Sequence, residues 1–357
     1  MQSPPASVAL PTKNPATKSA DGPTILALES SCDDTGAAVI RAGRVLVNRT
    51  AGQEMHARYG GVVPELASRA HNQHIVPLVL TALAEAGVAP EELDAVAVTR
   101  GPGLLGSLLV GTSFAKAYAA GLGVPVIGVN HMRAHVLAHF IEEPRPPFPF
   151  LCLTVSGGHT QLVVVRAPAD FELLGQTMDD AVGEAFDKAA KLLGLPYPGG
   201  PALDRLAQTA QPGAFADAFR VNDQPGFEFS FSGIKTQILY FLRDQTKLNP
   251  AFVEENRPAL AAAIQQALVA ALLRKLRRAV RETGIRHVAV AGGVAANSGL
   301  RAALAATAAQ DGWLGLYIPA FEHCTDNAAM VAMSAHFQFL AGDVGDGFLS
   351  PEPRLGV

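Results

Sequence analysis

The sequence predicts an α/β protein of two lobes, and three features of the chain support that prediction. The chain has 357 residues, 49% of them hydrophobic, which is enough apolar material to fill two cores. A pattern of strand, polar turn and strand near the amino terminus occurs a second time in the middle of the chain. Between the two copies, residues 142–149 (EEPRPPFP) are dense in proline, which neither continues a helix nor sits in a central strand. We therefore expect an internally duplicated protein with a lobe boundary in this linker.

The first lobe is expected to begin with the first copy of the pattern. Thr24–Glu29 (TILALE) and Gly36–Ile40 are apolar and β-rich, and the polar turn Ser30–Thr35 separates them. The elements expected next are a helix from Pro64 that is interrupted near Pro77, a strand at Ala95–Thr99, a helix around Leu104–Ala120 and a strand at Val126–Val129. The last of these strands leads into a helix that carries several histidines.

The second lobe is expected to begin with the second copy. It consists of Leu151–Val155 (LCLTV), the turn Ser156–Thr160 (SGGHT) and Gln161–Val165 (QLVVV). Helices and loops follow until a long Ala/Leu-rich helix, which we expect to open at Pro258, run to Thr283 and stop at Gly284, because proline favours the first turn of a helix and glycine its end. The final predicted unit is a strand, a glycine-rich turn and a helix, at His287–Ala291, residues 292–298 (GGVAANS) and Gly299–Ala309.

The composition excludes several classes of protein. Lys and Arg total 28 against 32 for Asp and Glu, and the net charge of −4 does not indicate a nucleic-acid-binding protein, so any such surface must be local or borrowed from a partner. The three cysteines stand far apart without a C-x-x-C pair. That spacing argues against a disulfide framework and against a thiolate zinc site, and it fits a reducing cytoplasm.

Three further segments bear on whether the chain enters a membrane, carries a signal peptide or has a phosphate-binding surface. The most apolar stretch, residues 259–273, is shorter than the about 20 residues that cross a bilayer, so we expect no membrane span. Residues 1–22 mix Pro, Ser, Ala and Thr without the apolar core of a signal peptide, which predicts a disordered tail. Five Arg and Lys residues within 274–281 are tempting as a phosphate-binding patch, but an exposed helix face is the better interpretation.

His131 and His135 are the first candidates for chemistry. They stand four residues apart on the expected helix after Asn130, so both imidazoles lie on one face, close enough to share a metal ion. The alternative is a solvated helix face. His139 continues the stripe and is expected to be structural. A zincin helix has Glu directly after its first histidine, but Met132 stands there, so a metalloprotease would lack its general base.

Asp326 is the candidate for a third ligand. A two-histidine metal site usually includes a carboxylate, and Asp326 lies in the segment His323-Cys-Thr-Asp-Asn327 at the start of an apolar helix. Asp is equally well suited to cap that helix, and the two interpretations are about even from the sequence. His323 is a further possible neighbour.

Three turns are candidates for ligand binding. The turn Ser156–Thr160 offers free backbone N–H groups to a phosphate or carboxylate, although an ordinary hairpin turn is the alternative. The strand-turn-helix unit at Gly292–Asn297 is a stronger candidate, since glycines let a ligand approach the backbone. This turn is not a G-x-G-x-x-G fingerprint, and no P-loop motif occurs. The acidic turn Ser30–Thr35 would poise a water or an ion, or would simply be an Asx turn.

Taken together, these segments resemble one family, the tRNA N6-adenosine threonylcarbamoyltransferases of the TsaD type, formerly described as O-sialoglycoprotein endopeptidases. The resemblance spans about residues 24–340. It is carried, in the order of the family, by ESSCDDTG, GGVVPELASRAH, GPGLLGSLLVG, NHMRAH, VSGGHTQL, GEAFDKAAKLLGLPYPGGP, FSFSGIKT, AGGVAANSGLR and CTDNAAM.

The resemblance implies an actin-like, heat-shock-ATPase-like α/β fold with duplicated strand-turn-strand cores. Residues 1–22 would be a disordered tail, 23–146 a first lobe to which a C-terminal helix at about 322–345 returns, and 147–321 a second lobe. It implies transfer of the threonylcarbamoyl group from threonylcarbamoyl-AMP to N6 of the adenosine 3′ of the anticodon in tRNAs that read ANN codons, with release of AMP. The implied partners are tRNA, a shorter paralogous subunit and a small ATPase, in the cytoplasm.

The resemblance also implies roles for particular residues. His131, His135 and Asp326 match the metal ligands of the family, with Fe2+ and Zn2+ both open. The positions that match the binding site for the adenylate and its acyl group are Thr154, Val155, Ser156, Gly157, Gly158, Asp187, Gly200, Asp204 and Asn297. Asp33 is a candidate for orienting the attacking amine. The usual turn of the family has Glu after that Asp, whereas this chain has Asp34.

Three other functions fit parts of the same pattern. A sugar or acetate kinase, or a chaperone-like ATPase, shares the expected fold but does not require a His-His-Asp metal site. An endopeptidase requires the general base that Met132 replaces. A scaffold without catalytic activity would tolerate alanine at Asp187.

Overall fold

A computed structural model describes residues 21–53, 56, 59–211, 213–345 and 349–357, and these form two compact units. Of the described residues, unit 1 comprises 21–53, 64–134, 327–345 and 349–356, and unit 2 comprises 56, 59–63, 135–211, 213–326 and 357. The predicted tail, residues 1–22, lies almost wholly outside the described residues. The lobe boundary expected in the linker 142–149 stays a prediction.

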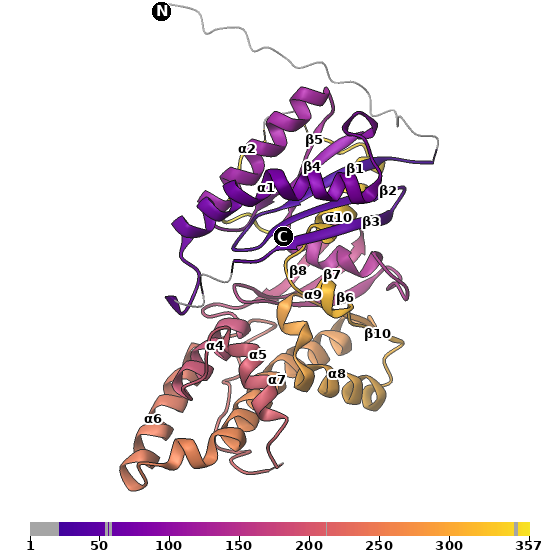
Figure 1. Cartoon of the computed structure of the whole chain (residues 1–357). Coiled ribbons are helices and arrows are strands. Elements are labelled where there is room, and N and C mark those ends of the chain that lie inside the picture. The colour runs from indigo at the N-terminus through magenta and orange to yellow at the C-terminus, as the bar shows by residue number, and fades with distance from the viewer. Residues whose placement is uncertain (1–20, 54–55, 57–58, 212, 346–348) are drawn as a thin grey trace, which may run out of the picture. The chain divides into compact units, whose positions relative to one another are not determined.

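Unit 1 contains a five-stranded sheet in the order β3-β2-β1-β4-β5 (Figure 1). Strand β1 pairs antiparallel with β2 and parallel with β4, and β4 pairs parallel with β5. The elements of this unit are β1 (Thr24–Glu29), β2 (Thr35–Arg41), β3 (Arg44–Ala51), α1 (Pro64–Ala86), η2 (Pro90–Glu92), β4 (Ala95–Gly101), α2 (Leu105–Leu122), β5 (Val126–Asn130) and α10 (Ala328–Leu340), with α3 (His131–Leu137) beginning directly after β5.

Helices cover both faces of this sheet. Successive side chains of its strands point to opposite faces, and both faces are apolar. Ala37 and Val39 of β2 pack in one core with Ile75 of α1 and Ala115 of α2. Gly36 faces the other way and lies so close to Ala328, at the start of α10, that a side chain there would be crowded. Unit 1 is therefore a three-layer α/β arrangement.

Unit 2 repeats this topology with its sheet in the order β10-β9-β6-β7-β8. Strand β6 pairs antiparallel with β7 and parallel with β9, as β1 does with β2 and β4. The duplication expected from the sequence is thus confirmed. The elements are η3 (Ala138–Phe140), β6 (Phe150–Val155), β7 (Thr160–Ala167), β8 (Asp170–Gln176), α4 (Val182–Leu192), α5 (Gly199–Ala207), α6 (Ser232–Leu248), α7 (Phe252–Thr283), β9 (His287–Ala291), η4 (Gly293–Ala296), α8 (Ser298–Asp311), β10 (Gly315–Tyr317) and α9 (Phe321–Cys324).

Two proline expectations were wrong. Helix α1 runs without interruption through Pro77, because Ile75, Val79 and Leu83 are buried in the core on both sides of the proline. Helix α7 begins at Phe252 rather than at Pro258, which lies inside its second turn. The predicted stop was correct: Gly284 caps α7 in the left-handed conformation, at φ 73°.

Helix α7 is the central helix of unit 2. By length and composition alone this one helix, among the described residues, would be able to cross a membrane, but 67% of its most apolar window is buried inside the protein. The expected exposed basic face was wrong for Lys275, whose side chain is 4% exposed and lies 2.8 Å from Asp223. Lys275 also donates to the carbonyls of Gln224 and Gly226, so this charge ties a loop to the helix.

Candidate active site

The amino end of helix α3 is held by Asn130, the last residue of β5. The side-chain oxygen of Asn130 accepts hydrogen bonds from the amides of Met132 (2.9 Å) and Arg133 (3.0 Å), which satisfies two N–H groups of the first turn. Its amide nitrogen donates to the carbonyl of Gly356 at 2.6 Å. The cap residue Asn130 thus starts the helix at its first histidine, His131, and the contact with Gly356 holds the cap in place.

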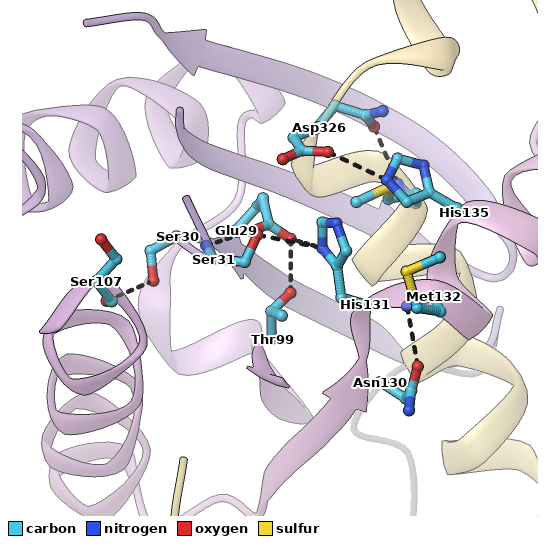
Figure 2. Close-up of polar contacts among 12 residues, drawn as sticks. Glu29, Ser30, Ser31, Thr99, Ser107, Asn130, His131, Met132, His135 and Asp326 are labelled. Carbon is cyan, nitrogen blue, oxygen red and sulfur yellow. Dashed lines mark hydrogen bonds and ion pairs between the residues drawn. The ribbon is translucent and has the colours of Figure 1, made fainter. Parts of the chain in front are cut away.

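His131 is oriented by a buried carboxylate that the sequence analysis did not identify. Its Nδ1 lies 3.1 Å from Oε2 of Glu29, the last residue of β1, and Glu29 is 1% exposed (Figure 2). The same oxygen accepts from the Thr99 hydroxyl at 2.6 Å, and the other accepts from the Ser31 amide at 2.5 Å. A carboxylate on one imidazole nitrogen is typical of metal-binding histidines, because it turns the other nitrogen toward the ion.

His135 meets Asp326 in the same region. The His135 Nε2 and Asp326 Oδ1 atoms lie 3.1 Å apart. A dashed line marks this contact in Figure 2. One nitrogen each from His131 and His135 and one oxygen from Asp326 all lie within 4.8 Å of one another. Asp326 does not cap α10: Asn327 is the cap, and its side-chain oxygen accepts from the Met330 amide at 3.1 Å. The carboxylate of Asp326 is therefore available to a metal ion.

The donor set fits a divalent transition metal. Two imidazole nitrogens and one carboxylate oxygen suit Zn2+ and Fe2+ alike, and three protein ligands leave positions open for a substrate. His139 is not a member of this cluster. It is buried in η3, and burial lowers its pKa to about 4, so it is neutral at pH 7.

Asp33 lies in the turn between β1 and β2, two residues after Ser31, whose hydroxyl oxygen is 3.3 Å from Nδ1 of His131. His71 of α1 braces this turn: its Nε2 donates to the carbonyl of Cys32 (2.9 Å) and its Nδ1 accepts from the hydroxyl of Thr35 (2.8 Å). Both contacts suit the neutral imidazole. Asp33 is thus connected to the metal candidates only through Ser31 of the same turn, and no hydrogen bond among the described residues joins Asp33 to them.

The brace at His71 predicts a pH dependence. Desolvation lowers the pKa of His71 below its usual 6.5, although the Cys32 carbonyl opposes the shift. A lowered histidine pKa contributes stability that is complete above about pH 6.5 and is lost as the pH falls through the folded-state value. Between pH 7 and pH 5 the melting temperature should therefore fall less in His71→Gln than in the wild type. Equal pH dependence of the two proteins in differential scanning calorimetry would contradict this role.

The substrate-binding candidates lie in unit 2, around the carboxyl ends of two parallel strands. Strand β6 ends at Val155 and its parallel neighbour β9 ends at Ala291. Open α/β sheets bind ligands at such ends, where loops and helix starts converge. The turn Ser156–Gly158 follows β6, and Gly292–Asn297 follows β9. Thr154 and Val155 are themselves buried in β6, which is paired with β7 and β9, so they position the turn that follows them.

The turn after β6 is closed by its own contacts and joined to α4. The Ser156 amide donates to the carbonyl of His159, and the Gly183 amide of α4 donates to the Ser156 carbonyl at 3.2 Å. Gly157 and Gly158 are exposed, and nothing lies within 4 Å of the place a Cβ would occupy at either. The backbone there remains open to a phosphate or acyl group.

The remaining candidates form two pairs. Asp187 of α4 accepts from the amide of Gly200, at the start of α5, at 2.9 Å. Burial raises the pKa of Asp187 above its usual range, and the Gly200 amide opposes that shift. Asp204 of α5 accepts from the amide (3.1 Å) and hydroxyl (2.7 Å) of Ser298.

Asn297 stands next to the second pair. Its side-chain oxygen caps α8 by accepting from the Leu300 amide at 2.8 Å, and its amide nitrogen donates to Gln265 of α7 at 2.9 Å. Its side chain is thus used to build the loop, and its place at the start of a helix leaves the helix N-terminus to assist anion binding.

Gly292 sets the loop after β9. Its φ is +89°, a region that other residues rarely adopt, and a Cβ would overlap the carbonyl of Val155. Gly292→Ala should lower the free energy of unfolding by about 1–3 kcal/mol, measured by urea titration. Gly233→Ala is the matched control, because the space around Gly233 in α6 is open and an alanine there costs nothing. Equal stability of the two variants would contradict the assignment.

The segment Gly101-Pro-Gly103-Leu-Leu-Gly106, part of one of the motifs that carry the family resemblance, runs from the end of β4 into α2 and has a G-x-G-x-x-G spacing that the sequence analysis did not point out. A side chain at Gly101 would overlap the backbone of Glu352, and one at Gly103 would overlap the backbone of Ser31. These glycines serve close packing of the C-terminal segment and of the acidic turn, which leaves no room for a phosphate against them.

Comparison with known proteins gives one consistent result. A family profile described as TsaD, tRNA N6-adenosine threonylcarbamoyltransferase, matches residues 44–333. Proteins named tRNA N6-adenosine threonylcarbamoyltransferase are similar over nearly the whole chain. The one from Cytophaga hutchinsonii is 58% identical over 334 residues, covering 94% of this chain and 96% of that protein. The one from Salinibacter ruber is 50% identical over 333 residues, covering 93% and 99%.

Solved structures resemble the fold at low sequence identity. Full-length HypF in a phosphate- and nucleotide-bound form has a TM-score of 0.59 at 14% identity, over 92% of this chain and 47% of that one. Component A of the (R)-2-hydroxyglutaryl-CoA dehydratase of Acidaminococcus fermentans has a TM-score of 0.52 at 15% identity, over 89% and 100%. At this level the likeness shows the fold alone, and it confirms the predicted actin-like architecture.

Proposed function

Because the chain belongs to the TsaD family of tRNA N6-adenosine threonylcarbamoyltransferases, we propose that it transfers a threonylcarbamoyl group from threonylcarbamoyl-AMP to tRNA. The acceptor is N6 of the adenosine 3′ of the anticodon in tRNAs that read ANN codons. A bond forms between N6 and the carbamoyl carbon, the bond from that carbon to the phosphate oxygen breaks, AMP leaves and N6 loses one proton. The His131, His135 and Asp326 cluster, in a chain of this family, is the observation that carries the proposal.

His131, His135 and Asp326 are the proposed ligands of one Fe2+ or Zn2+ ion. When bound, the ion supplies a Lewis acid for the carbamoyl or phosphoryl oxygens. Glu29 holds the His131 ring through Nδ1, and this contact would fix the tautomer that leaves Nε2 to bind the ion.

The loops at the ends of β6 and β9 are the proposed adenylate site. The exposed backbone of Gly157 and Gly158 would hold the phosphate and acyl group, and Thr154, Val155 and Ser156 would hold these glycines in place at the end of β6. Carboxylates accept hydrogen bonds from ribose hydroxyls, and Asp187 and Asp204 are proposed for this role. Gly200 keeps Asp187 in place through its amide, and Asn297 begins the helix whose N-terminus favours an anion.

Asp33 is proposed to orient the attacking amine. It lies on the turn that follows β1. Glu29 at the end of β1 and Ser31 in the turn both contact His131. The His71 brace limits the motion of this turn. A carboxylate held there would accept a hydrogen bond from the N6 amino group and direct its lone pair at the carbamoyl carbon.

An endopeptidase activity is disfavoured by the structure as well as by the sequence. Met132 stands where a zincin has its catalytic Glu, and its side chain is 1% exposed. A buried thioether can neither accept a proton nor reach a bound water.

The partners are proposed to be tRNA, a shorter paralogous subunit and a small ATPase, in the cytoplasm. Unit 1 offers an apolar face for the paralogue: Val76 and Leu80 on α1 are 49% and 61% exposed, and Leu105 and Leu109 on α2 are 52% and 45% exposed. Each pair stands one helical turn apart, so each lies on one face of its helix. Exposed apolar clusters of this kind are typical of protein interaction sites.

Replacing Leu80 and Leu109 together by glutamate should weaken binding of the paralogous subunit about 100-fold or more, because two charges would enter an apolar interface. Isothermal titration calorimetry measures the effect. Leu173→Glu and Leu314→Glu in unit 2 are matched exposed-leucine controls that should bind normally. Normal binding by the Leu80/Leu109 variant would place the interface elsewhere.

The transferase proposal is tested by mass spectrometry of tRNA nucleosides from cells depleted of this protein. Threonylcarbamoyladenosine should disappear and return when the wild-type gene is supplied, but not when the His135→Ala gene is supplied. An unchanged level of the modified nucleoside after depletion would refute the proposal. ATP turnover by the isolated protein without tRNA would favour a kinase or ATPase.

A further inference from the structure

A second cluster of metal-ligand residues lies in unit 2, apart from the cluster already described. It borders a pocket of about 110 Å³ between the segment that follows η3 and the segment that joins β10 to α9. The pocket is lined by His139, Glu142, Tyr317 and His323, among others. That volume is enough for a cation with a few of its water ligands, at about 10–15 Å³ each on the same measure.

Three side chains at the edge of this pocket have the chemistry of a metal site: Glu142 and His323 line the pocket, and Glu322 precedes His323 on α9. One nitrogen of His323 and one oxygen each of Glu142 and Glu322 all lie within 4.8 Å of one another. The His323 Nε2 and Glu142 Oε1 atoms are 3.8 Å apart, which is too long for a hydrogen bond. Two ligands of a tetrahedral Zn2+ ion lie about 3.4 Å apart, given metal–ligand bonds of about 2.0–2.2 Å. Small side-chain rotations therefore bring these atoms to ligand spacing.

Buried imidazoles in this pocket have unused ring nitrogens. His323 is 6% exposed and His139 is 5% exposed. Nδ1 of His323 and Nε2 of His139 are buried and have no hydrogen-bond partner among the described residues. A buried polar atom of this kind costs free energy unless a ligand or water satisfies it. The two carboxylates of the cluster therefore lie beside a buried imidazole, that of His323, whose remaining nitrogen has no partner among the described residues.

We propose that Glu142, Glu322 and His323 bind a second divalent transition metal ion, of the chemistry of Zn2+, with water in the pocket completing its coordination. Glu142 and Glu322 are exposed, so this ion would exchange with solvent more readily than one held by His131, His135 and Asp326. Glu142 belongs to the proline-rich linker and Glu322 to α9. The ion therefore cross-links the linker to the helix that begins five residues before Asp326.

The site is tested by counting metal ions on the full-length protein. After chelation and dialysis against Zn2+, mass spectrometry of the metal content should give two ions per wild-type chain and one per chain of the Glu142→Gln/Glu322→Gln variant. Glu143→Gln is the matched control, because Glu143 lines the same pocket without belonging to the cluster, and it should keep two ions. Both cluster carboxylates are exposed, so the double variant should fold normally.

A second pair of variants assigns the ions to their sites. His135→Ala should keep the ion at Glu142, Glu322 and His323, and adding the Glu142→Gln/Glu322→Gln changes to it should leave none. Two ions in the Glu142→Gln/Glu322→Gln variant, or the same metal content in this variant and the wild type, would overturn the proposal. Metal content is measured without any assay of transfer, so this result is independent of the proposed transferase activity.

Discussion

His135→Ala is expected to lose its metal ion and to lower kcat/KM for threonylcarbamoyl transfer by about 1,000-fold or more. Removal of one of three ligands releases the ion or distorts its coordination, and Lewis-acid stabilisation is worth several kcal/mol. A loss of about 4 kcal/mol corresponds to about 1,000-fold in rate. The change also leaves Asp326 without the imidazole that lies 3.1 Å from its carboxylate. Steady-state assays with purified tRNA, run beside metal analysis, measure both effects.

His74→Ala is the matched control for this experiment. His74 also stands on a helix, α1 of unit 1, and it is half-buried, but it belongs to neither metal cluster. The variant should keep its metal ion and the wild-type rate. Full activity of His135→Ala in metal-depleted buffer would remove the metal ion from the mechanism, whereas loss of activity with retained metal would assign His135 a different role.

Glu29→Gln is expected to weaken metal affinity by about 10–100-fold, with a matching loss of activity at limiting metal. Oε1 of Glu29 accepts from the Ser31 amide, and Oε2 accepts from Thr99 and faces Nδ1 of His131. A glutamine has the same shape, but its NH2 group is a donor, so it would face a donor at one of these positions. His131 would then lose the contact that orients its ring.

The affinity is measured by competition between the protein and a chromophoric chelator. Glu65→Gln serves as the control, since Glu65 forms an exposed ion pair with Arg69 on α1, and such a pair contributes little. Metal supplied at high concentration should restore the activity of Glu29→Gln, but not that of His135→Ala. Wild-type affinity in Glu29→Gln would show that the carboxylate only serves the packing of β1.

The fold was predictable where a sequence pattern within one helix or strand determines its structure. The apolar runs at residues 24–29 and 287–291 match β1 and β9 residue for residue, and Gly284 ends α7 as expected. The expectations failed where tertiary packing overrides local propensity. A proline interrupts an isolated helix, but Pro77 sits between turns whose apolar side chains are buried, and that burial holds the helix together.

In the candidate site, too, local patterns were predictable and contacts between distant segments were not. The helical spacing of His131 and His135 is enough to pair them, since both lie on one short helix. From the sequence, Asp326 was equally well interpreted as a helix cap or as a metal ligand. The structure resolves the capping question, because Asn327 turns its side chain into α10 while Asp326 meets His135. His323 was noted as a neighbour, but its grouping with Glu142 depends on the approach of the linker to α9.

By itself the sequence determined the duplicated α/β architecture, the histidine pair and the glycine-rich turns, because periodicity and turn chemistry act within one element or its immediate neighbours. Only the tertiary structure decided which distant side chains act together. Glu29 and His131 are 102 residues apart, and Asp204 and Ser298 are 94 apart. Strand β1 lies beside β4, and β4 beside β5, so the end of β1 comes close to the start of α3. Sheet order and register make such contacts, and no local pattern in the chain records them.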